Sequence, residues 1–261
     1  MGKHSFETIL YEQIDGIVTI TLNRPASFNA FTPLMNKEIK IALETANKDD
    51  TVRVIILTGE GKAFCAGQDI HTIDADVNYA NLLRENYHPM VNTLKSIEKP
   101  TIAAVNGVAA GAGMSLALLT DFRLIHEDAK FVSAFMDIGL IPDSGFFYIL
   151  PRLIGYSKAL EIITLKKTID SNEAVDIGLA TKIIPRDEWN KKVFDFAKKF
   201  EQIPTKAFSL IKRYMLDSMH LPIENVLKQE AEAQRIASLS KDHHEGLSAF
   251  LEKRPAEFSG K

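Results

Sequence analysis

The chain has 261 residues, of which 46% are hydrophobic and 25% are charged, a composition typical of a globular protein. Its net charge of −3 and its evenly spread basic residues argue against binding to nucleic acid or to an anionic membrane. A single cysteine, Cys65, excludes an internal disulfide and fits a reducing compartment. Residues 1–6 lack the apolar stretch of a signal peptide, and no apolar run is long enough to cross a bilayer. We therefore expect a cytoplasmic protein.

The first part of the chain alternates predicted strands with predicted helices. Apolar runs rich in β-branched residues predict strands at residues 17–22, 52–57, 101–105 and 122–125. Helical spacing and capping residues predict helices at residues 33–48 and 79–97. Residues 107–120 are expected to form a turn followed by a helix. Continuous apolar strands separated by helices indicate a buried, largely parallel sheet, and therefore an α/β fold.

Beyond Pro142 the pattern becomes mostly helical. Helices are expected at residues 157–164, 171–178 and 186–200 and from residues 205, 222 and 241, with one strand at 180–184. We therefore divide the chain into a core of residues 1–200 and a C-terminal helical region of residues 201–261. The apolar faces of such a region need its own core or a neighbouring subunit to cover them.

Two turns rich in small residues each follow a predicted strand. The first spans residues 61–70, and the second spans residues 105–114 and leads into a helix. Small residues let a ligand approach main-chain N–H groups, and the start of a helix attracts an anion. Two amides from separate turns that meet on one oxygen form an oxyanion hole, although each turn could also serve packing alone. Leu116 stands where a dinucleotide-binding motif needs its third glycine, which disfavours nucleotide binding.

A lone carboxylate, Asp143, lies in the turn of residues 139–145, which is expected to open a helix. The side chain could cap that helix or act as an acid and base. Burial would raise the pKa of Asp143, whereas the helix N-terminus would lower it, and the sequence leaves both open.

Four motifs in this order resemble the crotonase (enoyl-CoA hydratase/isomerase) superfamily: residues 23–25, 63–69, 106–113 and 139–143. The resemblance covers nearly the whole chain. It implies a crotonase-like spiral of ββα turns that binds acyl-CoA, with a C-terminal helical region that forms trimers or dimers of trimers. It also implies that the CoA thioester is the substrate and that neither a cofactor nor a metal is required.

The resemblance assigns roles to particular residues of this sequence. The amides of Gln68 and Ala112 would form the oxyanion hole, and Asp143 would move the proton. Contacts with CoA are expected at Ala26, Phe28, Ala66, Asp69, Ile70, Gly111 and Lys253. The acyl pocket is expected to include Ser115, Phe135 and Phe146.

The reaction is inferred from which acids are present. Hydratases of this superfamily carry two glutamates, at the positions held here by Ser115 and Phe135, and hydration needs a general base together with a general acid. An acid at the position of Asp143 resembles Δ3,Δ2-enoyl-CoA isomerases and the ring-epoxide (oxepin-forming) isomerases of phenylacetate breakdown. The sequence therefore favours an acyl-CoA isomerase in which one carboxylate moves a proton from C2 to C4. Phe146 and Phe147 replace the small pair usual in relatives, and they could narrow the acyl pocket or belong to the core.

Several alternatives stay open at this point. The chain could be an enoyl-CoA hydratase. Asp137 could be a second acid or a surface residue, and the sequence favours the surface. It could also be a non-catalytic acyl-CoA-binding protein. A thioester hydrolase that uses Ser115 is disfavoured because the nucleophile-elbow pattern is absent from the sequence. Residues 242–245 include metal-ligand types, but neighbouring histidines do not share a helix face.

Overall fold

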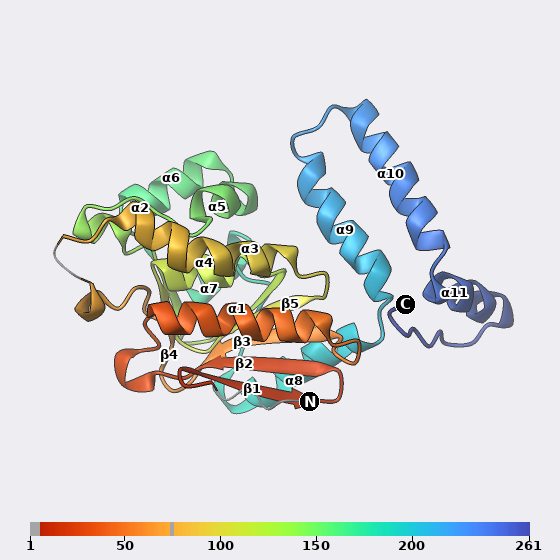
Figure 1. Cartoon of the computed structure of the whole chain (residues 1–261), viewed down its shortest axis with the longest axis horizontal. Coiled ribbons are helices and arrows are strands. Elements are labelled where there is room, and N and C mark those ends of the chain that lie inside the picture. The colour runs from red at the N-terminus through yellow and green to blue at the C-terminus, as the bar shows by residue number, and fades with distance from the viewer. Residues whose placement is uncertain (1–5, 74–75) are drawn as a thin grey trace.

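The computed structural model describes residues 6–73 and 76–261, and its core contains two sheets (Figure 1). Residues 1–5 lie outside the described residues. They belong to the N-terminal stretch that is not expected to be a signal peptide. The larger sheet has the strand order β1-β2-β3-β5-β7-β10. Its strands are β1 (Ile9–Ile14), β2 (Ile17–Leu22), β3 (Val54–Gly59), β5 (Thr101–Val105), β7 (Phe122–His126) and β10 (Lys182–Ile184). Only the β1–β2 pair of this sheet is antiparallel.

The smaller sheet has the order β4-β6-β8-β9 and consists of three-residue strands. These strands are β4 (Ala63–Cys65), β6 (Val108–Ala110), β8 (Lys130–Val132) and β9 (Thr168–Asp170). The first three run parallel, and β9 is antiparallel to β8. The expected α/β class with largely parallel sheets is confirmed.

Helices cover both faces of the larger sheet. On one face Ile55 and Leu57 belong to the same apolar cluster as Ile39 and Leu43 of α1 (Pro33–Lys48). On the other face Val54 and Ile56 share a second cluster with residues of α8 (Trp189–Glu201). Because side chains alternate along a strand, neighbouring residues of β3 are buried against different helices. This explains the continuous apolar runs in the sequence.

The remaining helices of the core surround the smaller sheet and the end of the larger one. The expected helix at 79–97 contains a π-helical turn, Leu83–Tyr87, between α2 (Tyr79–Leu82) and α3 (His88–Ser96). The others are α4 (Ala112–Leu118), α5 (Phe146–Ile154), α6 (Tyr156–Thr164) and α7 (Ser171–Asp176). None of the helices in the described ranges has the length and apolar content needed to span a bilayer.

Three C-terminal helices extend away from the core as an arm (Figure 1). They are α9 (Thr205–Ser218), α10 (Ile223–Ser238) and α11 (Lys241–Glu252), and the expected C-terminal helical region is thus confirmed. Apolar side chains such as Met215 and Leu227 are exposed on this arm. Arg53 of the core holds both ends of the arm, since its guanidinium donates to the carbonyls of Ile203 and Phe258.

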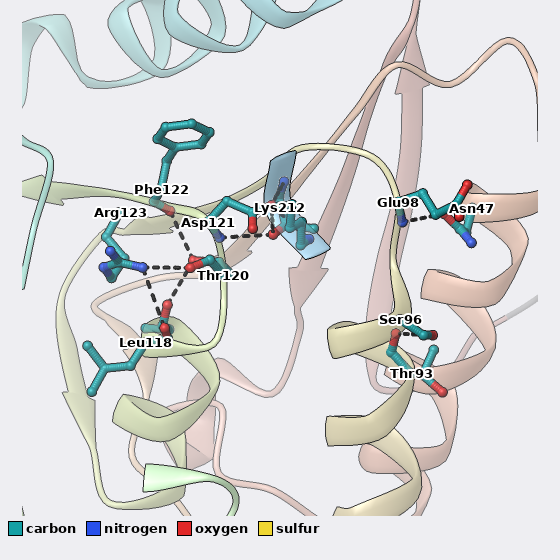
Figure 2. Close-up of polar contacts among 12 residues, drawn as sticks. Asn47, Thr93, Ser96, Glu98, Leu118, Thr120, Asp121, Phe122, Arg123 and Lys212 are labelled. Atoms are coloured by element: carbon teal, nitrogen blue, oxygen red, sulfur yellow. Dashed lines mark hydrogen bonds and ion pairs between the residues drawn. The ribbon is translucent and has the colours of Figure 1, made fainter. Parts of the chain in front are cut away.

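A polar cluster where α9 meets the core anchors this arm (Figure 2). Lys212 of α9 forms an ion pair of 2.9 Å with Asp121, the residue that precedes β7. The same carboxylate oxygen accepts hydrogen bonds from the main-chain N–H and the hydroxyl of Thr101. The two charged side chains are only 12% and 16% exposed, so the pair is shielded from solvent.

Loss of this ion pair should loosen the arm. Lys212→Met keeps the length of the side chain but leaves a largely buried carboxylate without its cation, and we expect the free energy of unfolding to fall by about 2 kcal/mol. The neighbouring Arg213 pairs with Glu98 at 57% and 46% exposure, so Arg213→Met should cost less than about 1 kcal/mol. Denaturant unfolding of both variants measures the difference. Equal losses would contradict the anchoring role of Lys212.

Candidate active site

The two glycine-bearing turns lie against each other at the junction of β4 and β6. These strands pair in parallel, with Cys65 opposite Ala109. A Cβ atom on Gly113 would lie 2.3 Å from the carbonyl oxygen of Cys65, and one on Gly67 would lie 3.0 Å from that of Ala110. Gly67 also has a φ of +91°, which a residue with a side chain rarely adopts. Glycine is therefore required for the two turns to approach this closely.

The close approach brings two free main-chain donors together. Among residues 6–73 and 76–261, the N–H groups of Gln68 and Ala112 donate to no acceptor. Ala112 is the first residue of α4, where an N–H has no partner within the helix. Gln68 lies between two residues whose main chains bond to Phe31, so its own N–H points the other way. Both residues line one cavity of about 250 Å³.

Asp143 faces the same cavity from the turn before α5. Gly145 occupies the N-cap position, and the main-chain carbonyl of Asp143, not its carboxylate, accepts the N–H of Phe146. The alternative that the Asp143 side chain caps the helix is therefore wrong. Its Oδ1 is buried and has no hydrogen-bond partner among the described residues. Burial raises the pKa of the Asp143 carboxyl above its ordinary value, and this effect outweighs the lowering by the Ser144 side chain and by His88.

The rest of the cavity wall is mostly apolar. It includes Ile70, Ile73, Tyr79, Leu82, Leu83, Tyr87, Phe135, Ile138 and Leu140. A second carboxylate, Asp137, also belongs to the wall, but its side chain is 51% exposed and forms an ion pair of 2.7 Å with Lys166. The cavity thus combines an apolar lining, two free amides, one buried carboxylate and one exposed carboxylate in an ion pair with Lys166.

Two of the residues expected in the acyl pocket lie behind its wall instead. Ser115 is fully buried, and its hydroxyl donates to the carbonyl of Asp143 at 3.2 Å. Phe146 is also fully buried and packs edge-on against Phe135 with ring centroids 5.6 Å apart. Phe135 lines the cavity. Ser115 and Phe146 lie one layer deeper, where each supports a residue of the wall. A place in the acyl pocket stays a prediction for all three residues.

The residues expected to contact CoA lie in several different places. Ala66, Ile70 and Gly111 line the cavity, and Ala26 and Phe28 are exposed on the segment after β2. Asp69 is buried and forms an ion pair of 2.9 Å with Arg24, so its carboxylate holds this segment in place. Lys253 is exposed at the end of α11, outside the cavity wall. Contact with CoA stays a prediction for all of these residues.

Sequence reasoning missed one polar residue of the wall, Tyr87. Its side chain is 2% exposed, and its hydroxyl donates to Oε1 of Gln68 at 2.5 Å. Burial raises the pKa of this phenol, which keeps it protonated. Pro89 was the available signal, because a proline inside a predicted helix marks a local change of its geometry.

The candidate metal ligands are engaged in the structure itself. Asp242 is buried and accepts the main-chain N–H groups of Ser259 and Gly260, and Glu245 pairs with Arg254. A second group, residues 126–128, lies outside the cavity, and Arg186 contacts both of its carboxylates. Neither group lies beside Asp143.

Comparison with known proteins agrees with this fold. The Enoyl-CoA hydratase/isomerase family matches residues 12–261. The chain is 36% identical to the 1,2-epoxyphenylacetyl-CoA isomerase of Escherichia coli K12, over 98% of this chain and 99% of that protein. It is 38% identical to a Rhodobacter capsulatus protein named "Probable enoyl-CoA hydratase", over 98% and 100% of the two chains. A crystal structure of enoyl-CoA hydratase from Bacillus anthracis, 31% identical, superposes with a TM-score of 0.91 over 98% and 100% of the chains.

The chain therefore belongs to the enoyl-CoA hydratase/isomerase family, and the expected resemblance is confirmed. It is an enzyme of the crotonase superfamily that acts on acyl-CoA, and the spiral fold with its C-terminal helices is the crotonase fold.

The burial of Asp143 should cost stability when the carboxyl is ionised. Because its folded-state pKa is raised, the native state loses stability as pH rises from the ordinary aspartate pKa through the raised one. Asp143→Asn should therefore raise Tm at pH 7, and this gain should vanish below the ordinary pKa of about 3.9. Thermal unfolding across pH measures it. A pH-independent effect of Asp143→Asn would contradict the assignment.

Proposed function

We propose that this enzyme is an acyl-CoA isomerase that moves a double bond through a thioester enolate. The observation that carries the proposal is one buried carboxylate, Asp143, in the same cavity as two unpaired amides. The substrate class follows from the family, and the thioester itself supplies the reactive group, so no further cofactor enters the reaction. The proposed substrates are a Δ3-enoyl-CoA, converted to the Δ2 isomer, and a ring epoxide of an aromatic acyl-CoA.

The amides would act on the thioester carbonyl. Removal of a C2 proton places negative charge on this oxygen, and the N–H groups of Gln68 and Ala112 would then hold it as an enolate. A preorganised donor in such a site lowers the barrier by about 3 kcal/mol. The two N–H groups need not reorient during the reaction, because both turns are fixed by main-chain hydrogen bonds and close packing.

Asp143 would carry the proton. Its ionised carboxylate takes the proton from C2, the charge spreads over C2, C4 and the oxygen, and the same proton returns to C4. The double bond then lies between C2 and C3. A carboxyl whose pKa is raised by burial is a stronger base when ionised, and its acid form is available for the return step.

The acyl group would lie against the apolar wall. Tyr79, Tyr87 and Phe135 present aromatic surface there, which suits a flat ring as well as an alkenyl chain. The named activity of the Escherichia coli relative supports the ring-epoxide form of the proposal. We further propose that CoA lies along Ala26, Phe28, Ala66 and Ile70, with Lys253 at its phosphates, and that the arm assembles trimers.

Hydration is the second candidate, and Asp137 favours it. Adding water needs two groups, and Asp137 is the other carboxylate of the cavity wall, while the Rhodobacter capsulatus relative carries a hydratase name. The exposure of Asp137 and its ion pair with Lys166 leave its carboxylate poorly placed to act on a substrate in the cavity. A non-catalytic acyl-CoA-binding protein would have no use for a desolvated, unpaired carboxylate.

Substitution of the two acids separates these candidates. Asp143→Asn should lower kcat for a trans-3-enoyl-CoA by about 10²- to 10⁴-fold, because the proton carrier is lost, and leave binding of the CoA ester nearly unchanged. Asp137→Asn should isomerise at the wild-type rate. The rise in absorbance of the conjugated product measures both. Full activity of Asp143→Asn would remove this residue from the mechanism, and hydration of crotonyl-CoA that depends on Asp137 would establish the hydratase.

The oxyanion donor at Ala112 can be removed with one substitution. Proline is favoured at the first helical position and lacks an N–H, so Ala112→Pro should preserve the fold and lower kcat by about 10²- to 10³-fold. Ala112→Val adds comparable bulk but keeps the N–H, and it should lose much less. Steady-state rates of the two variants test the donor, and equal losses would show that bulk, rather than the missing N–H, is responsible.

A further inference from the structure

The side chain of Gln68 is tied to three different groups around the oxyanion turn. Its Nε2 donates to the carbonyls of Phe31 and Asp69 at 3.2 and 3.1 Å. Its Oε1 accepts the hydroxyl of Tyr87 at 2.5 Å. The amide group of this side chain therefore has no freedom to rotate while Tyr87 keeps its bond.

Tyr87 is itself held rigidly. Its ring meets the ring of Phe31 edge-on, with centroids 5.7 Å apart and an interplanar angle of 86°. Phe31 in turn forms the main-chain bonds on either side of Gln68, from its N–H to Gly67 and from Asp69 to its carbonyl. Tyr87 thus contacts both the side chain of Gln68 and the residue that fixes its main chain.

A local irregularity in the helix directs the side chain of Tyr87 toward Gln68. Pro89 cannot donate to the carbonyl of Glu85, and its ring would clash with that carbonyl in a regular α-helix. The chain responds with the π-helical turn Leu83–Tyr87, in which the N–H of His88 reaches back five residues to Leu83. One extra residue in a turn rotates the following helix by about 100° relative to a continuous α-helix. Such π-turns are frequent at functional sites.

We infer that Tyr87 is a positioning residue of the oxyanion hole, which holds Gln68 so that its main-chain N–H meets the thioester oxygen. The inference rests on the proposed function of that amide. Tyr87 also lines the cavity beside the acyl group, so the fit of the acyl group and the orientation of the donor depend on one side chain. A donor fixed before the charge develops stabilises the enolate more than one that must reorient.

Tyr87→Phe removes the hydroxyl and keeps the ring against Phe31. We expect kcat to fall about tenfold, which corresponds to one hydrogen bond of about 1.4 kcal/mol, while KM stays within about twofold. Tyr156→Phe is the matched control. Tyr156 lies outside the cavity wall, is 72% exposed and makes no side-chain hydrogen bond within residues 6–73 and 76–261.

A spectroscopic measurement separates positioning from general stability. The ligand is butyryl-CoA labelled with ¹³C at its carbonyl. When it is bound to the wild-type enzyme, its carbonyl stretching frequency should be lower than that of the free ligand, because the amides polarise the bond. Tyr87→Phe should show a smaller shift, and Tyr156→Phe should show the wild-type shift. Gln68→Met removes the acceptor of the Tyr87 hydroxyl, so it should match Tyr87→Phe, and the double variant should be no worse than either.

The outcomes separate the positioning role of Tyr87 from the existence of the oxyanion hole. A wild-type shift that Tyr87→Phe and Gln68→Met both retain, with kcat unchanged, would overturn the positioning role and leave the oxyanion hole intact. The absence of any shift in the wild-type enzyme with bound ligand would instead overturn the oxyanion hole. Thermal melting shows whether each variant is folded, and Gln68→Met tests the same bond if Tyr87→Phe is not.

Discussion

The site depends on the closeness of two main-chain turns that have no room for a side chain between them. A Cβ atom on Gly113 would overlap the carbonyl of Cys65, and one on Gly107 would lie 2.1 Å from the carbonyl of Lys62. Contacts this short cannot be relieved by rotating a side chain, because main-chain atoms are on the other side. The same closeness leaves the amides of Gln68 and Ala112 without acceptors among the described residues, and both residues line one cavity. The donors of the proposed oxyanion hole are thus a product of packing.

At Asp143, the stability of the fold and the proposed function make opposite demands. A desolvated carboxyl whose Oδ1 has no hydrogen-bond partner among the described residues destabilises the folded protein when ionised, yet in the proposed mechanism the same desolvation would make it a better proton carrier. The surrounding structure tolerates this because the turn is supported by main-chain bonds and by the buried hydroxyl of Ser115 beneath it. Ser115 and Phe135 leave the cavity with a single buried acid among the described residues of its wall.

Local patterns predicted most of the elements but not all of them. The strands at 17–22 and 101–105 and the helix at 33–48 match the sequence because continuous burial or a clear cap defines them. The strand expected at 52–57 is observed two residues later, and β1 was missed because most of its residues are partly or fully exposed at the edge of the sheet. Strands β4, β6, β8 and β9 are three residues long, too short to show a period.

The same limit applies to the site. Its turns and Asp143 could be predicted because each is a short motif, whereas the layer in which a side chain ends depends on residues far away in the sequence. Ser115 and Phe146 lie behind the wall because α4 and α5 present them to the core, and Tyr87 enters it because Pro89 alters the helix.

The proposed mechanism requires the enzyme to remove a proton from C2 of a thioester with Asp143 as the base. Incubation of saturated butyryl-CoA in deuterated water tests it directly, since this ligand can neither isomerise nor accept water. We expect proton NMR to show C2 exchange with the wild-type enzyme and none with Asp143→Asn; exchange at equal rates in both, or none in the wild-type enzyme with bound ligand, would contradict the account.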